Sequence, residues 1–135
     1  MAVLGGAFPL LALPTASLAG PPDRPPAARA TADHAESARH LELAAGRHDP
    51  EAEFRLAILY EKGLGRRPDP TRALEWYRKA ADDGSPGAQR VLAQDYDFGI
   101  GGLPQDAAQA IIWYRKAAAG GDPYAERVIS SSSYR

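Results

Sequence analysis

A six-residue segment that occurs twice constrains the fold of this chain more than any other feature. Residues 76–81 and residues 113–118 both read Trp-Tyr-Arg-Lys-Ala-Ala, and together they contain both tryptophans of the protein. The flanking residues also match, at separations of 36 or 37 positions. The matched pairs are Leu56 and Leu92, Tyr60 and Tyr96, Gly63 and Gly99, Gly65 and Gly101, Ala73 and Ala110, Trp76 and Trp113, Tyr77 and Tyr114, Ala81 and Ala118, and Gly84 and Gly121. A period of this length predicts stacked supersecondary units in which each repeat contacts its neighbours.

Each unit carries the signals for two helices. We predict a helix start where Asp or Ser precedes Pro, because the side chain caps free amides and proline suits the first helical position. Such pairs begin at Asp49, Asp69, Ser85 and Asp122, and Asp106 supplies a further cap. Apolar residues then recur with the spacing of one helix face, and Gly63 is placed to end the first helix in the left-handed conformation.

Weaker copies of the pattern flank the two full units. Upstream, residues 33–45 fit a degenerate second helix; downstream, the helix after Asp122 is expected to fray near Ile129. We therefore predict an all-α protein, an α/α solenoid over residues 33–129 with two full helix pairs and a half-repeat at each end. A disordered N-terminal segment precedes the solenoid in this prediction, and residues 130–135 form a disordered tail.

The N-terminal segment has the composition of an export signal. Residues 1–19 contain no charged side chain, and Ser17-Leu18-Ala19 places small residues where a signal peptidase needs them. We expect cleavage after Ala19 and export to the periplasm or the medium, although a basic n-region is absent. A membrane anchor and a disordered tail are the alternatives. Residues 20–32 contain four prolines and are interpreted as an extended linker.

The repeated pattern resembles a known family. It reads Ala-x-x-x-Leu-Ala-x-x-Tyr-x-x-Gly-x-Gly and then Asp-x-x-x-Ala-x-x-Trp-Tyr-x-Lys-Ala-Ala-x-x-Gly, and it is similar to the Sel-one-like repeat (SLR), a relative of the tetratricopeptide repeat. The similarity covers Ala52 to Gly121, with Ala57 and Ala93 where the family usually has glycine. The resemblance implies an α/α solenoid that serves as a bacterial envelope adaptor with no catalytic residues of its own.

Composition argues against several other functions. Sixteen basic and seventeen acidic residues nearly balance, so the basic excess of a nucleic-acid-binding protein is missing. The chain has no cysteine, and His34, His40 and His48 lack the spacing of a zinc-binding helix. We therefore expect no metal site, no cofactor and no enzymatic activity. The two tryptophans are interpreted as repeat-to-repeat packing residues rather than ligand-stacking platforms.

The leading functional hypothesis is an adaptor that binds a protein or peptide partner on the concave face. By analogy with tetratricopeptide solenoids, that groove is lined by first-helix residues that point away from the packing stripe. These are Phe54, Arg55, Ile58 and Lys62 in one repeat, and Arg90, Gln94 and Phe98 in the next. Alternatively, the apolar members of this set pack against the adjoining half-repeats.

Two further hypotheses stay open at this point. The first is an envelope regulatory or cell-wall-associated module that binds a sensor domain or a glycan. Exposed aromatic rings at Phe54, Phe98 and Tyr124 would support glycan binding. The second is a subunit of a hydrolase. The last helix pair also leaves an apolar edge, which could support self-association. That edge comprises Ala110, Tyr114, Val128 and Ile129.

Overall fold

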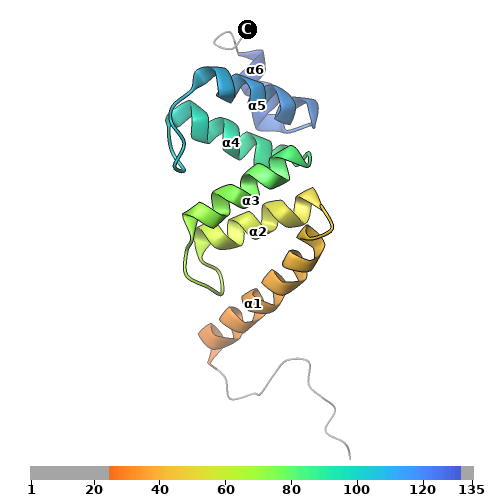
Figure 1. Ribbon diagram of the computed structural model, residues 1–135, viewed down its shortest axis with the longest axis vertical. Helices are drawn as coiled ribbons and strands as arrows, with labels where there is room; N and C mark the ends of the chain where they lie inside the picture. Colours follow the sequence, from red (N-terminus) through yellow and green to blue (C-terminus); the bar gives the residue numbers. More distant parts are fainter. Residues whose placement is uncertain (1–24, 132–135) are drawn as a thin grey trace, which may run out of the picture.

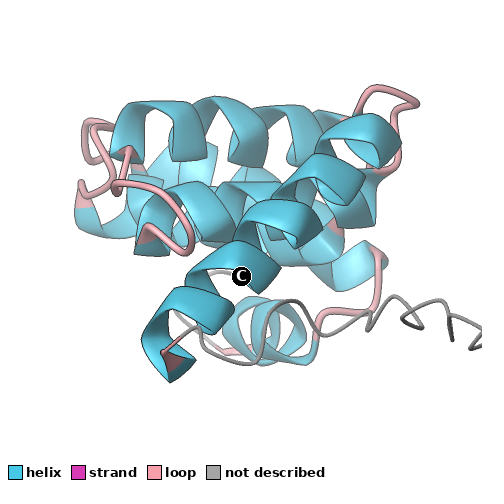
Figure 2. Ribbon diagram, turned by 90° about the horizontal axis from the view of Figure 1, so that it is seen from below, coloured by secondary structure: helices cyan, strands magenta, loops and turns pink. Residues whose placement is uncertain are grey.

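The computed structural model describes residues 25–131, which form six helices stacked in chain order along the long axis of the molecule (Figure 1). The helices are α1 (Pro26–Ala45), α2 (Pro50–Lys62), α3 (Pro70–Asp82), α4 (Pro86–Phe98), α5 (Ala107–Ala119) and α6 (Pro123–Ser130). Each helix packs on the one that follows it, and the described region contains no strand (Figure 2). The helix pairs α2–α3 and α4–α5 form two full repeats flanked by the half-repeats α1 and α6, which confirms the predicted fold class.

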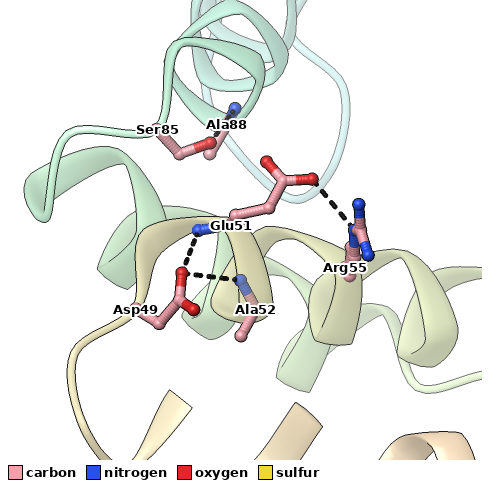
Figure 3. A network of polar contacts seen from close by, with 6 residues as sticks. All are labelled: Asp49, Glu51, Ala52, Arg55, Ser85 and Ala88. Carbon is pink, nitrogen blue, oxygen red and sulfur yellow. Dashed lines mark hydrogen bonds and ion pairs between the residues drawn. The ribbon is translucent and has the colours of Figure 1, made fainter. Parts of the chain in front are cut away.

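The predicted caps begin five of the six helices. Figure 3 shows the carboxylate of Asp49 accepting hydrogen bonds from the amides of Glu51 and Ala52, at 3.0 and 3.3 Å. Equivalent bonds are made by Asp69, Ser85, Asp106 and Asp122. At the other end, Gly63 closes α2 and Gly99 closes α4 with φ angles of 67° and 65°, the left-handed conformation that favours glycine.

The core is built from small and large residues at the matched repeat positions. Leu56, Tyr60, Tyr77 and Leu92 are buried among alanines in one cluster, and Tyr114 is the large residue of a second. The half-buried Tyr96 packs against both clusters. The matched alanines Ala81 and Ala118 are buried and half-buried, and Ala57 and Ala93 are fully buried. Small residues at helix crossings let the helices approach closely, while the aromatic rings fill the remaining space.

The first helix is longer than predicted. It begins at Pro26, so residues 26–32, which were interpreted as part of an extended linker, are helical. Proline is compatible with the first helical position, and the alanines that follow favour helix, so the prolines start this helix rather than prevent it. Residues 1–24, with the predicted signal peptide, and residues 132–135 of the predicted tail lie outside the described residues. Among residues 25–131, every helix falls short of the length or apolarity needed to span a bilayer.

The C-terminal edge is better covered than predicted. Ala110 and Tyr114, expected to be partly open, are both 0% exposed because α6 packs over α5. Val128 and Ile129 of α6 are half-buried against the same cluster. The remaining open apolar surface of this edge is therefore smaller than the sequence indicated, and it lies mainly on α6.

Candidate partner-binding surface

Two of the predicted groove residues line an open hollow between α1 and α2. Arg55 and Ile58 come from α2, and the hollow has a volume of about 490 Å³. Its other lining residues are His34, Ser37, His40, Leu41 and Leu59. Ile58 and Leu41 are half-buried and also pack against the core, so the floor of the hollow is apolar. Its rim is polar, because Ser37, His40 and Arg55 are exposed.

Phe54 is engaged inside the molecule rather than in a groove. Its ring centroid lies 5.9 Å from that of Tyr77, and a Cβ placed on Gly87 would come within 2.8 Å of the Phe54 ring. The ring therefore fills a contact between α2 and the start of α4. The alternative that apolar groove residues pack inside the molecule is therefore correct for Phe54. Its neighbours are α3 and α4 rather than a half-repeat.

The three predicted groove residues of α4 lie in different environments. Arg90 Nε lies 3.1 Å from Asp122 Oδ2, so this side chain ties α4 to the residue that caps α6. Gln94 Oε1 accepts a hydrogen bond from the same guanidinium at 3.5 Å. Phe98 is 61% exposed at the end of α4, and Lys62 is exposed at the matching end of α2. The seven predicted residues thus do not form one continuous groove.

The two tryptophans are partly buried. Trp76 and Trp113 pack against the core clusters, as expected for residues that join repeats. Each ring also carries a lysine ammonium from three residues further along, with Lys79 Nζ at 4.7 Å and Lys116 Nζ at 4.3 Å from the ring centroids. These distances allow cation–π attraction. Both rings also keep part of their surface exposed to solvent, so packing against the core accounts for only part of each ring.

A partly buried polar contact recurs in both repeats. Tyr77 Oη donates to Glu61 Oε2 at 2.6 Å, and Tyr114 Oη lies 3.5 Å from Asp97 Oδ2 at the matching position. Burial, followed by the Glu61 carboxylate, raises the pKa of Tyr77 above its usual range. The phenol therefore stays protonated and acts as the donor in this contact.

Asp95 is a feature of this region that sequence reasoning missed. It occupies the position where the first repeat has the buried Leu59, and it lies beside Glu61 and Tyr77. Burial, with a smaller effect of the Glu61 charge, raises the pKa of Asp95 to about 6. The exchange of a buried leucine for a carboxylate at matched positions is the sequence signal that could have revealed it. The α1 side of the hollow, with His34, Ser37 and Leu41, was missed as well, because residues 33–45 align with a second helix and the groove was expected on first helices alone.

Comparison with known families identifies the repeat. The family model described as the Sel1 repeat matches residues 50–85 and 86–122, which correspond to the two full helix pairs. Among curated proteins, the ERAD-associated E3 ubiquitin-protein ligase component HRD3A of Arabidopsis thaliana is 37% identical over 62 residues. That match spans 45% of this chain and only 9% of the plant protein.

Solved structures share the fold. A Sel1 repeat protein from Oxalobacter formigenes superposes with a TM-score of 0.65 at 33% identity and covers 67% of this chain and 68% of its own. The protective antigen c5321 of uropathogenic Escherichia coli, described as having an SLR fold, gives 0.62 at 38% identity over 68% of this chain and 20% of its own. The cysteine rich protein B of Helicobacter pylori gives 0.62 at 22% identity, covering 67% of this chain and 68% of its own, a likeness of fold alone.

Proposed function

Because this chain belongs to the Sel1 repeat family, we propose that it is a non-enzymatic adaptor that binds a protein or peptide partner. The α1–α2 hollow is the observation that carries this proposal. An apolar floor with a polar rim suits a partner that inserts one apolar side chain and makes polar contacts around it. The named role of the plant relative, a component of an E3 ubiquitin-protein ligase, supports assembly as the use of such repeats.

Phe98 and Lys62 do not line the hollow, and we keep them as separate candidate contacts at the ends of α4 and α2. They occupy matching repeat positions, and both are exposed. Phe54 and Arg90 do not belong to the proposed surface. The Phe54 ring packs on Tyr77, and the Arg90 guanidinium pairs with Asp122. The contact between Phe54 and Tyr77 also leaves only Phe98 and Tyr124 of the three aromatic rings that the glycan-binding hypothesis requires. We favour a protein partner for this reason.

Capture of partners from the native envelope with the purified chain tests the proposal. Ser37→Trp should fill the hollow, and Arg55→Glu should reverse the charge at its rim. Arg55 pairs with Glu51 on the exposed face of α2, so its replacement should have little effect on folding. Arg115→Glu changes an exposed residue of α5 and serves as the control. A protein recovered with the parent chain and the control, and lost with both hollow variants, supports the proposal. Equal recovery with all four chains would place the site elsewhere, and capture of glycan instead of protein would favour the envelope module.

We also propose export to the periplasm or the medium, based on the uncharged segment at residues 1–19. A fusion of residues 1–30 to a reporter that works only outside the cytoplasm should give signal. N-terminal sequencing of the exported protein should then begin at Gly20. Soluble cytoplasmic protein that retains Met1 would contradict this proposal.

A further inference from the structure

We propose that His48, Glu53 and Asp83 form a binding site for a divalent transition-metal ion, with Zn²⁺ as the representative ion. The three residues come from the loop between α1 and α2, the first turns of α2, and the end of α3. One ligand atom from each lies within 4.8 Å of the other two, and His48 Nδ1 is 3.4 Å from Asp83 Oδ2. Ligand atoms of a zinc ion stand roughly 3.3 Å apart, given metal–ligand distances of about 2.0 Å. Small side-chain rotations therefore suffice to complete the site.

Glu53 points to a cation at this position independently of the cluster. Its side chain is 0% exposed, and its partner of opposite charge is Lys79, whose ammonium lies 3.5 Å from Oε1, beyond ordinary hydrogen-bond geometry. A buried carboxylate without hydrogen bonds is costly unless a charge compensates it. The Lys79 ammonium supplies one positive charge against the carboxylates of Glu53 and Asp83, and a dication bound between them and the imidazole would balance both.

Lys79 is the group that competes with the metal ion. Its ammonium lies 3.5 Å from Glu53 Oε1, and the side chain is 39% exposed. The same ammonium lies over the Trp76 ring, so it has a second favourable contact when it moves away from the carboxylate. Metal binding and the Lys79–Glu53 ion pair are therefore alternatives, and loss of the lysine should favour the metal.

The second repeat provides an internal comparison. At the positions that match His48, Glu53 and Asp83 it has Gly84, Gln89 and Gly120, none of which ionises. All three potential ligands are thus confined to the first repeat. His48 also adopts a φ of 60°, where the matching Gly84 has 102°. A positive φ of this size is costly for any residue other than glycine. The presence of a histidine at this position therefore supports a specific role for its imidazole.

The donor set indicates the class of metal. One imidazole nitrogen with two carboxylate oxygens suits Zn²⁺ and neighbouring first-row dications. His48 is 73% exposed, which leaves the ion accessible from solvent and leaves coordination positions for water.

Titration calorimetry of the full chain with ZnCl₂ tests the site. The parent chain should bind one ion, and Glu53→Gln should weaken binding by roughly tenfold or more, since changes even in the groups that support metal ligands cost about that much. His48→Gly should have a similar effect. Both variants introduce the residue of the second repeat, so they should fold, and circular dichroism checks this. Lys79→Met should instead tighten binding, because the competing ammonium is gone.

His40→Gln is the control for nonspecific binding by surface histidines, since His40 lies on α1 outside the cluster. Zinc binding should be unchanged in this variant. The proposal is overturned if the parent chain takes up no zinc. It is equally overturned if Glu53→Gln and His48→Gly, both folded, bind zinc as the parent does.

Discussion

At the scale of single residues, the tyrosines of the second helices combine burial with a polar contact. Tyr77 and Tyr114 are buried in separate clusters, and each hydroxyl lies beside a carboxylate from the preceding helix. The ring contributes buried apolar area, while the hydroxyl fixes the register of one helix against the next. One residue type thus joins the two helices of each repeat.

Removing either ring should therefore be costly. Tyr77→Ala and Tyr114→Ala should each lower the free energy of unfolding by about 3–5 kcal/mol, because each leaves a cavity in a small core. Urea denaturation followed by circular dichroism measures this. Ile112→Ala is the control on α5, where the side chain is 45% exposed, and its cost should stay below about 1 kcal/mol. Unchanged midpoints in the tyrosine variants would remove these rings from the core.

Asp95 should make stability depend on pH. The folded-state pKa of this acid is raised from 3.8 to about 6, so the folded state resists its ionisation. Well below pH 3.8 the carboxyl is protonated in both states and costs nothing; stability is lost as the pH rises from about 3.8 to about 6, and the full penalty is present above that. A shift of this size corresponds to about 3 kcal/mol at full strength, which solvent screening of a half-buried group reduces to about 1 kcal/mol.

Asp95→Asn should remove this penalty. We expect the variant to exceed the parent in unfolding free energy by about 1 kcal/mol at pH 7 and to match it at about pH 3. Urea denaturation of both chains at the two pH values gives the difference, in which the contributions of groups that do not interact with Asp95 cancel; Glu61, whose charge acts on Asp95, is part of the measured effect. A difference that does not change with pH would show that Asp95 ionises freely in the folded protein.

At the scale of elements, Asp122 caps its own helix and also pairs with a residue of another helix, whereas the ion pair of the Asp69 cap stays within α3. The Asp122 carboxylate accepts a hydrogen bond from the amide of Ala125 at 2.9 Å and also pairs with Arg90 of α4. The start of α6 is therefore anchored to the preceding repeat as well as capped. A short helix of this kind depends on such contacts, because helices of this length are not stable alone.

Asp122→Ala should accordingly cost more than the loss of a simple cap. We expect a loss of about 2 kcal/mol, against about 1 kcal/mol for Asp106→Ala, which removes only the cap of α5. Hydrogen exchange should show faster exchange of α6 amides in the Asp122 variant, with α2 unaffected. Equal costs for the two variants would mean that the Arg90 contact adds no stability.

At the scale of the whole molecule, the stack formed by residues 25–131 has a single unpaired helix at each end, α1 and α6. The half-buried Val128 and Ile129 of α6 and the exposed Tyr124 form the open apolar edge at one end. Solenoids usually need about three repeats and capping ends for stability. The 135-residue chain is therefore expected to associate through this edge, with itself or with a partner.

Val128→Glu should reduce the apparent mass measured by light scattering, because it places a charge on the edge. A polar capping helix added after Ile129 should reduce the mass too, and should also raise the melting temperature. The second change separates loss of association from partial unfolding, since unfolding would lower the melting temperature. A monomer at every concentration, with a melt that the cap does not change, would show that α1 and α6 already seal the ends.

The sequence by itself determined the helices, their caps, the repeat and its core positions. These features depend on short-range physics: the 3.6-residue period, the capping of free amides, and the left-handed glycine at a helix end. The start of α1 was missed because its alanine-rich segment has no apolar stripe to set a register. Tertiary structure alone decided which first-helix side chains face solvent, because exposure depends on the neighbouring helix. Phe54 turned onto Tyr77, Arg90 paired with the α6 cap, and Ile58 came to lie in a hollow with α1. The meeting of His48, Glu53 and Asp83 is likewise a result of packing, since the fold brings a loop, a helix and a helix end together across 35 residues of chain.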